Sequence, residues 1–299
     1  MNSKRVPAKA KIFPGAVCAA LLTCVIAMAG VAAANEGASK PADLAVNPSI
    51  PDPSETMHKL ASGQVIEVNN PYGNVYLRFG GYEHKLTIRS MLQQPEGAAK
   101  IEIAAVDQGA RLLFAPKLPD GVALAQGQRL DVALYVPEGH QLRVATTSGE
   151  IESRGVRADQ DLNSTSGVIT VWVRPGVIVA ATSDAGDITA YLYGKAPAGS
   201  RQRIATRTGS ISAIVPQDYD ADVSMSTSGA FTTEFSLSVA YMDGSEPDKH
   251  ARVSIGRVVR GDGGAALALE SLRGDIRIMR QAVFVEAADP ATGGANDLH

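Results

Sequence analysis

The sequence predicts an all-β protein: a β-solenoid of stacked rungs of about 20 residues, preceded by an N-terminal β region. Three observations lead to this fold class. A glycine-containing turn recurs in the second half of the chain, and many short stretches alternate between apolar and polar residues. Helical patterning after residue 34 is limited to Ser90 to Ala98, where Pro95 interrupts it. Alternation with a period of two is typical of strands that bury one face.

The recurring turn is a short polar segment that ends in glycine. The turn glycines are Gly149, Gly167, Gly186, Gly209, Gly229 and Gly274. An apolar residue stands two places after each of them: Ile151, Ile169, Ile188, Ile211, Phe231 and Ile276. A hydroxyl residue stands three places before each: Thr146, Ser164, Ser183, Thr206, Ser226 and Ser271. The glycines are about 20 residues apart, but the last interval spans about two periods, which indicates a degenerate turn or an insertion.

This period is too short for a helix–turn–helix repeat and fits a coil turn made of two or three short strands. One rung cannot bury its own apolar column, whereas stacked rungs bury one another's. We expect the turn glycines to supply a positive φ, and the column hydroxyls to point inward and bond along the stack. The alternative fold is an antiparallel β-sandwich with evenly spaced turns.

Residues 1–34 have the pattern of a secretory signal peptide. A basic start (Lys4, Arg5, Lys9 and Lys11) precedes an apolar stretch that ends in Ala32-Ala33-Ala34. The alternatives are a retained membrane anchor and, through Cys24, a lipoprotein signal. Both cysteines, Cys18 and Cys24, lie in this segment, so the mature chain has no disulfide. Removing its four basic residues from the 28 leaves 24 against 31 acidic residues, a net charge of −7, which disfavours nucleic acid and anionic lipid as partners. No later apolar run is long enough to span a bilayer.

The rest of the chain divides by composition. Residues 35–56 are rich in Pro, Ala and Ser and predict a disordered spacer. An all-β domain is expected over 57–280, with N-terminal strands in 57–136 and the solenoid repeats in 137–280. Corners at Pro175, Pro197 and Pro216 alternate with the glycine turns. Residues 236–250 are expected to form a loop that lengthens one rung, 252–260 and 265–279 to close the stack, and 281–299 to form a disordered tail.

The sequence predicts no catalytic, cofactor-binding or metal-binding residues. The positions after the turn glycines are Glu150, Val168, Asp187, Ser210, Ala230 and Asp275, so no two adjacent rungs pair carboxylates there. Asp184 either faces Asp187 or bonds the backbone of its own turn. The histidines His58, His84, His140, His250 and His299 have no partner at metal-ligand spacing.

Two other features have a functional and a structural interpretation. Trp172, Tyr191 and Tyr193 lie on adjacent rungs; they either point outward, to stack on sugar rings or a partner, or fill a strand face. The tripeptides Arg260-Gly261-Asp262 and Arg273-Gly274-Asp275 match an integrin ligand, but the second is the repeat turn itself. Chance occurrence is the better explanation of both.

The apolar strand ending in Val136-Pro137, the segment Leu142 to Val144 and the serial Ser/Thr-x-x-Gly-x-Ile turns resemble the bacterial putative-adhesin domain family. The resemblance covers about Gly63 to Met279. It implies a β-solenoid domain of unknown function and supplies no catalytic or binding residues.

These observations favour an exported, non-enzymatic β-solenoid that acts as a scaffold or adhesin-like domain in the cell envelope, in the periplasm or at the cell surface. Its partner would be a protein or glycan of the envelope. The alternatives are a periplasmic accessory or sensor domain for another envelope protein and a polysaccharide-acting β-helix enzyme, which would need carboxylates clustered on neighbouring rungs.

Overall fold

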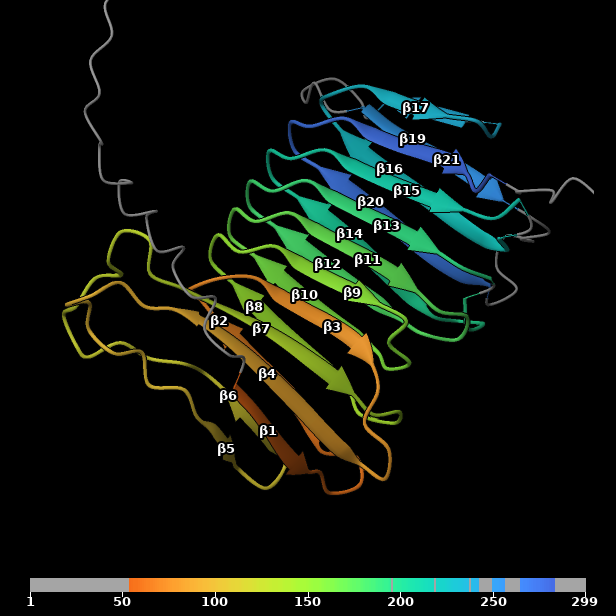
Figure 1. Cartoon of the computed structure of the whole chain (residues 1–299). Coiled ribbons are helices and arrows are strands. Elements are labelled where there is room, and N and C mark those ends of the chain that lie inside the picture. Colours follow the sequence, from red (N-terminus) through yellow and green to blue (C-terminus); the bar gives the residue numbers. More distant parts are fainter. Residues whose placement is uncertain are drawn as a thin grey trace, which may run out of the picture. The chain divides into compact units, whose positions relative to one another are not determined.

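The structure is a computed structural model that describes residues 54–194, 196–217, 219–236, 238–241, 249–255 and 264–282, with the backbone alone for 238–241 and 249–255. The chain divides into two units, Met1–Pro48 and Ser49–His299, and every described residue lies in the second. The predicted signal peptide, the spacer up to residue 53 and the tail from residue 283 lie outside these ranges. The regular structure in the described ranges is all β-strand, so the all-β prediction is confirmed (Figure 1). No described segment is a helix that could cross a membrane.

The strands form two mixed sheets in which most pairs are parallel. The first sheet contains, in spatial order, β1 (Ser54–Lys59), β4 (Lys85–Gln93), β7 (Arg129–Val136), β3 (Val75–Phe79), β9 (Ile151–Arg154), β11 (Ile169–Val173), β13 (Ile188–Leu192), β15 (Ile211–Val215), β21 (Ile276–Arg280) and β17 (Phe231–Thr233). The second contains β18 (Ser238–Tyr241), β19 (Lys249–Ile255), β16 (Ala221–Thr227), β20 (Ala265–Ser271), β14 (Arg201–Thr206), β12 (Val179–Ser183), β10 (Gln160–Ser164), β8 (Leu142–Thr146), β2 (Val65–Asn70), β6 (Arg111–Phe114) and β5 (Ala105–Asp107).

Each glycine turn joins a strand of the second sheet to a strand of the first. The segment around Gly167, for example, runs from β10 through the turn into β11. Equivalent positions of neighbouring segments pair in register, so Ile169 lies between Ile151 and Ile188. The strands alternate between buried and partly exposed residues, and the buried rows of both sheets form one hydrophobic core. The alternation therefore places the predicted isoleucine column in that core.

The turn glycines serve a different purpose from the one expected. None of the six predicted turn glycines has a positive φ. A β-carbon on any of them would instead lie within 1.8–2.6 Å of the backbone oxygen of the glycine in the adjacent turn. The positive-φ glycines near the repeats lie at the opposite corners, Gly155, Gly176, Gly194 and Gly199 among them. The prediction of a positive φ at the turn was therefore wrong, and close backbone stacking is what requires glycine there.

The hydroxyl column completes the same turn. The Ser183 hydroxyl accepts a hydrogen bond from the Gly186 N–H at 2.8 Å. In the next turn, the Thr206 hydroxyl accepts from Gly209 N–H at 3.1 Å and donates to the carbonyl of Gly186 at 3.1 Å. Each such hydroxyl closes its own turn or bonds to the neighbouring one, so the predicted inward, stack-bonded role is confirmed. Around Gly229 the bonding hydroxyl belongs to Thr227 and not to the predicted Ser226.

The last turn segment does not close the stack as predicted. Strand β20 pairs with β14 on one side and β16 on the other, and β21 lies between β15 and β17 (Figure 1). The segment around Gly274 is thus inserted between those around Gly209 and Gly229, which explains the double interval. The inserted β20 buries Ala265, Leu267 and Leu269 and is paired along both edges, as an interior strand must be. The predicted loop 236–250 contains β18 and the start of β19, which pair antiparallel with each other, while 242–248 and 256–263 lie outside the described residues.

The other end of the sheets has a similar arrangement. Strands β2 and β3 flank a turn at Gly73 and pair in parallel with β8 and β9. Strands β6 and β7 come later in the sequence but lie outside β2 and β3. Antiparallel strands β4 and β5 then cover β7 and β6. Such covering blunts edges that would otherwise pair with another chain.

Two sequence expectations in this region need correction. Ser90 to Gln93, the start of the weak helical pattern, lies within β4. Strand β1 begins at Ser54, inside the segment 35–56 assigned to the spacer.

Candidate functional site

The outer face of the first sheet carries a row of arginine and aromatic side chains. Cross-strand pairing places the row in register across β3, β9, β11, β13, β15 and β21. Its members are Arg78, Arg154, Trp172, Tyr191, Ile214 and Met279, and we call it the arginine–aromatic row. Adjacent members are about 4.8 Å apart along the stack because that is the spacing between hydrogen-bonded strands.

The side chains of the row stack on one another. The rings of Trp172 and Tyr191 are stacked, with centroids 5.0 Å apart and an interplanar angle of 1°. The Arg154 guanidinium lies 4.3 Å from the centroid of the Trp172 ring, a cation–π distance. The flanking Val171 and Val173 are buried, so Trp172 points outward, as one of the two sequence interpretations expected. Both faces of the Trp172 ring are therefore covered, and the ring presents its edge to solvent.

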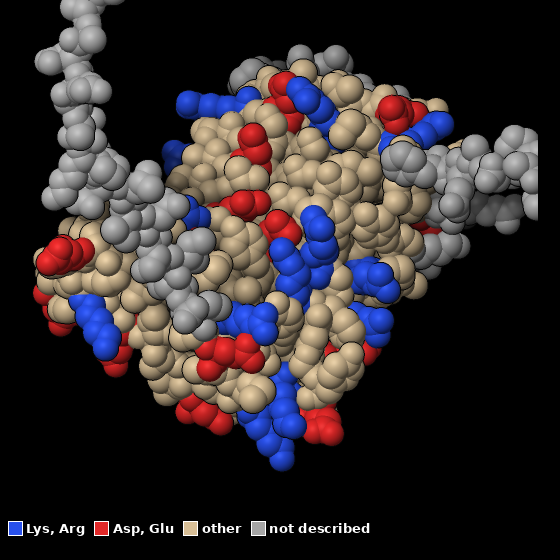
Figure 2. Space-filling view, viewed as in Figure 1, with Lys and Arg blue, Asp and Glu red and all other residues tan. Residues whose placement is uncertain are grey.

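The arginines of the row are held by a shared carboxylate. Arg78 Nη2 lies 2.6 Å from Glu152 Oε1, and Arg154 Nε lies 3.8 Å from the same oxygen. The Arg154 side chain keeps 60% of its surface exposed while that of Glu152 keeps 20%. Figure 2 shows Lys and Arg side chains gathered over the part of the face where Figure 1 places β3 and β9. Arg154 therefore offers an accessible cation beside the aromatic pair.

The outer face of the second sheet has a different character. Its cross-strand row runs through Glu67, Arg143, Asp161, Ala180 and Arg203. The ion pairs Arg111–Glu67 and Arg203–Glu270, at 2.8 and 2.7 Å, lie on this side. This row contains no aromatic residue, so it differs from the arginine–aromatic row on the outer face of the first sheet.

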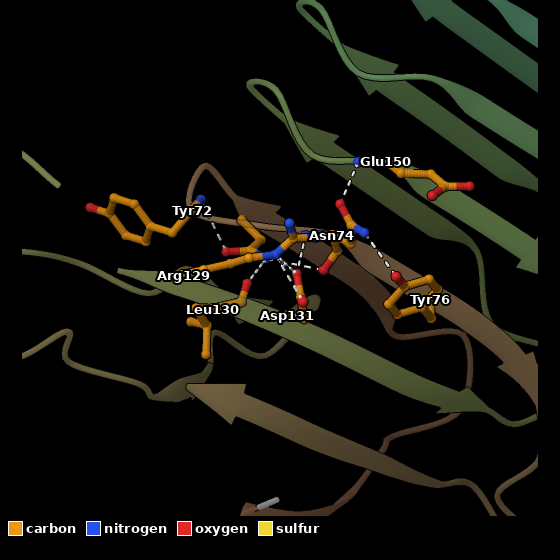
Figure 3. Close-up of polar contacts among 8 residues, drawn as sticks. Tyr72, Asn74, Tyr76, Arg129, Leu130, Asp131 and Glu150 are labelled. Atoms are coloured by element: carbon orange, nitrogen blue, oxygen red, sulfur yellow. Dashed lines mark hydrogen bonds and ion pairs between the residues drawn. The ribbon is translucent and has the colours of Figure 1, made fainter. Parts of the chain in front are cut away.

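The polar residues after the turn glycines are part of the stack. Asn74 Oδ1 accepts a hydrogen bond from Glu150 N–H at 2.8 Å, and Asn74 N–H donates to Asp131 Oδ1 at 2.7 Å (Figure 3). Asp187 and Asp275 accept in the same way from the N–H groups of Ser210 and Ala230. The carboxylates of Asp187 and Asp275 therefore connect each turn to the neighbouring one.

The two integrin-like tripeptides have different positions. In Arg273-Gly274-Asp275, Gly274 is stacked on Gly209, and Asp275 bonds the next turn. This tripeptide is the repeat turn, as the sequence suggests. Arg260-Gly261-Asp262 lies outside the described residues.

Two histidines that look isolated in the sequence meet in space. His84 Nδ1 and His140 Nε2, 56 residues apart in the chain, lie 3.0 Å apart. His140 is buried and His84 is exposed. Sequence spacing could not reveal this pair because the two residues belong to different loops, between β3 and β4 and between β7 and β8. Groups of three or more potential metal-binding side chains do not occur within the described ranges.

A small pocket lies at the proline corners. It is lined by Val177, Tyr193, Gln202 and Tyr219, among others. Gln202 Nε2 donates to the Tyr219 hydroxyl at 3.0 Å. Burial raises the pKa of Tyr219 to about 12 although the bond from Gln202 opposes the shift.

Comparisons with known proteins found similar chains among solved bacterial structures, at low sequence identity. No family model and no curated protein matches the sequence. Among solved structures, the chain is similar to a putative cell adhesion protein from Clostridium sporogenes, with 13% identity, coverage of 77% of this chain and 100% of that one, and a TM-score of 0.45. It is also similar to a putative adhesin from Bacteroides fragilis, with 11% identity, coverage of 77% and 97%, and a TM-score of 0.30. A putative lipid binding protein from Parabacteroides distasonis has 11% identity, coverage of 77% and 97%, and a TM-score of 0.26. The resemblance to putative adhesins is thus found among solved structures as well as in the turn motif.

Proposed function

We propose that this chain is an exported, non-enzymatic β-solenoid that serves as a scaffold or adhesin-like interaction domain in the bacterial cell envelope. The observation that carries the proposal is the arginine–aromatic row. Arg, Trp and Tyr are the residues most enriched at the energetic centres of protein interfaces. Here they lie in a straight line on one face of a rigid sheet, which is how a binding surface is kept in a fixed shape.

The in-register parallel pairing of successive turn segments supports the solenoid. Each turn of the proposed coil contributes one strand to each sheet and has a glycine turn at one corner. The opposite corner contains a proline in three turns, at Pro175, Pro197 and Pro216, and Gly155 in the turn between β9 and β10. The proline corners are closed by backbone hydrogen bonds from Val177 N–H to the Arg174 carbonyl, from Ser200 N–H to the Pro197 carbonyl and from Tyr219 N–H to the Pro216 carbonyl. In such a coil each added turn extends the same outer face. The row is a direct consequence of that extension.

The geometry of the row favours a protein over a glycan as partner. A sugar ring commonly binds an aromatic side chain by lying on its face. Both faces of Trp172 are covered, by Arg154 and Tyr191. Ring edges, the Trp172 N–H, the Tyr191 hydroxyl and the Arg154 guanidinium remain, and these groups suit the polar and carboxylate groups of a protein surface. The same surface would also suit the alternative role, an accessory or sensor domain for another envelope protein. Co-purification of one partner protein in a fixed stoichiometry would favour that role.

The interaction surface is tested by binding to an isolated envelope fraction. A double variant, Arg154→Ala with Trp172→Ala, removes the centre of the row. The matched control, Arg143→Ala with Asp161→Ala, changes two neighbouring residues on the outer face of the second sheet. We expect the affinity of the first variant to fall by at least about tenfold, because such a fall corresponds to the loss of one energetically dominant interface residue. The affinity of the control variant should stay unchanged. Equal binding of both variants contradicts the assignment of the surface.

Export is tested by protease treatment of intact and outer-membrane-permeabilised cells of the source bacterium. Cleavage in intact cells supports a surface adhesin. Protection until permeabilisation supports a periplasmic scaffold or sensor. Protection that persists after permeabilisation, with the protein recovered in the cytosol, contradicts export.

A further inference from the structure

The histidine pair at the N-terminal end has the features of a metal site. His84 Nδ1 and His140 Nε2 face each other at 3.0 Å. Their rings are nearly perpendicular, at 82°, with centroids 5.2 Å apart. Imidazole nitrogens are the commonest protein ligands of zinc, copper and nickel ions.

The second nitrogen of His140 is oriented as in known metal sites. His140 Nδ1 lies 2.9 Å from the backbone oxygen of Gln64. A carbonyl oxygen only accepts hydrogen bonds, so Nδ1 carries the proton and Nε2 keeps its lone pair toward His84. Metal-binding histidines typically donate their other N–H to a carbonyl or carboxylate in this way.

The loop that presents His84 is held in an unusual backbone conformation. Glu83 and His84 are the non-glycine residues with positive φ among those described, at 58° and 59°. The His84 carbonyl accepts a hydrogen bond from Leu60 N–H at 2.7 Å, which fixes the loop against the segment after β1. Strained residues are kept where the surrounding structure over-determines them, and they cluster at functional sites.

We propose that His84 and His140 bind one divalent transition-metal ion of the zinc, copper or nickel class. Two zinc–nitrogen bonds of about 2.0–2.1 Å at a tetrahedral angle put the nitrogens about 3.3 Å apart. The loops would therefore separate by only roughly 0.3 Å. Binding displaces the proton that His84 Nδ1 donates to His140 Nε2; this proton moves to His84 Nε2, so His84 remains a neutral ligand. Exposure of His84 gives the ion a route from solvent. The remaining coordination positions are open to water, so the affinity is expected to be weaker than that of a four-ligand structural site.

The ion would join three segments of the N-terminal end. His84 lies between β3 and β4, His140 lies between β7 and β8, and Gln64 lies in the turn before β2. Metal binding would thus stabilise the antiparallel cover of the first sheet and raise the thermal midpoint of unfolding. This role is independent of the arginine–aromatic row, because none of these residues belongs to it.

The test uses residues 35–299 without a histidine tag, freed of metal by chelation. Zn²⁺, Ni²⁺ and Cu²⁺ are titrated separately by calorimetry and by thermal unfolding, with Mg²⁺ as a control ion. The informative variant is His84→Asn, because asparagine tolerates positive φ and can still donate to His140 but offers no imidazole. The matched control is His58→Ala, which removes a histidine on β1 that bonds Thr56.

The expected result is one ion per chain for the unmodified protein and for His58→Ala. His84→Asn should lose at least about tenfold in affinity and lose the metal-induced rise in thermal midpoint. Absence of binding by the unmodified protein overturns the proposal. Binding of equal affinity by His84→Asn also overturns it, because it places the ion elsewhere.

Discussion

The backbone oxygen of Gly167 lies 2.0 Å from the position that a β-carbon on Gly186 would occupy. The same contact recurs between the glycines of neighbouring turns, including Gly209 with Gly274 and Gly274 with Gly229. Each recurring glycine therefore marks a turn whose backbone packs directly against the next turn, and the glycine-to-glycine contacts show which turns are neighbours. This relationship also reveals the true order of the last two segments.

Replacing Gly186 with alanine should destabilise the protein by more than about 2 kcal/mol, because the neighbouring backbone cannot move aside cheaply. Gly176→Ala is the matched control. Gly176 has a φ of 81° but open space around its β-position, so only the local backbone cost of about 1–2 kcal/mol applies. Urea unfolding of both variants measures the difference. A smaller effect at Gly186 than at Gly176 would show that the turns are not tightly stacked.

The inserted position of β20 can be tested with engineered cysteines in the chain lacking Cys18 and Cys24. Ala205 and Glu270 are paired on adjacent strands, so Ala205→Cys with Glu270→Cys should form a disulfide on oxidation. Ala205 and Ser226 are separated by β20, about 10 Å apart, so Ala205→Cys with Ser226→Cys should not. Mobility on a non-reducing gel distinguishes the two. The opposite result would mean that the segments stack in sequence order.

The stacked pair in the arginine–aromatic row should have a spectroscopic signature. Trp172 is the sole tryptophan of the chain, so its signals report on this site alone. Tyr191→Ala should abolish its coupled circular dichroism signal and cost about 0.5–1.5 kcal/mol beyond the lost burial. Tyr82→Ala, at a side chain 83% exposed, should change neither. An unchanged spectrum in the Tyr191 variant would contradict the stacking.

Stability should fall at alkaline pH because of Tyr219. The folded-state pKa is raised from 10.0 to about 12, so the folded form retains a proton that the unfolded chain releases. The contribution is fully present below about pH 10 and is lost as pH rises toward 12, with a total of about 2–3 kcal/mol. Tyr219→Phe should remove this part of the pH dependence. Urea unfolding between about pH 8 and about pH 12, a range that includes both pKa values, measures the effect. Parallel curves for the two proteins would refute it.

The local content of each turn segment could be predicted from the sequence. Hydroxyl, glycine and isoleucine recur because each bonds, stacks or packs against its counterpart in the next segment. The spatial order of the segments could not be predicted. Ala265 to Ser271 alternates between apolar and polar residues like the other strands, and its own sequence does not specify that it pairs with β14 and β16. The first turn was missed because Asn70 stands where the others have a hydroxyl. Asn70 instead donates to the Leu130 carbonyl at 2.8 Å.

The candidate sites depend on contacts between distant segments. Alternation alone allowed Trp172 to point outward or inward, and only the buried Val171 and Val173 decide between them. The position of Arg154 over its ring follows from the register of β9 and β11. The meeting of His84 with His140 follows from two loops whose spacing carries no motif. The arginine–aromatic row and the histidine pair therefore depend on which strands and loops lie next to each other, and the amino-acid composition does not reveal this.

The most direct test of the arginine–aromatic row as the interaction surface is site-specific photo-crosslinking in the source organism. A photoreactive residue at Thr189, beside Tyr191 on the outer face of the first sheet, is compared with one at Asn163 on the outer face of the second. We expect a discrete protein adduct from Thr189 that disappears when Arg154→Ala and Trp172→Ala are added, and none from Asn163. An adduct from Asn163 alone, or one from Thr189 that survives both substitutions, would contradict the assignment of the arginine–aromatic row as the interaction surface.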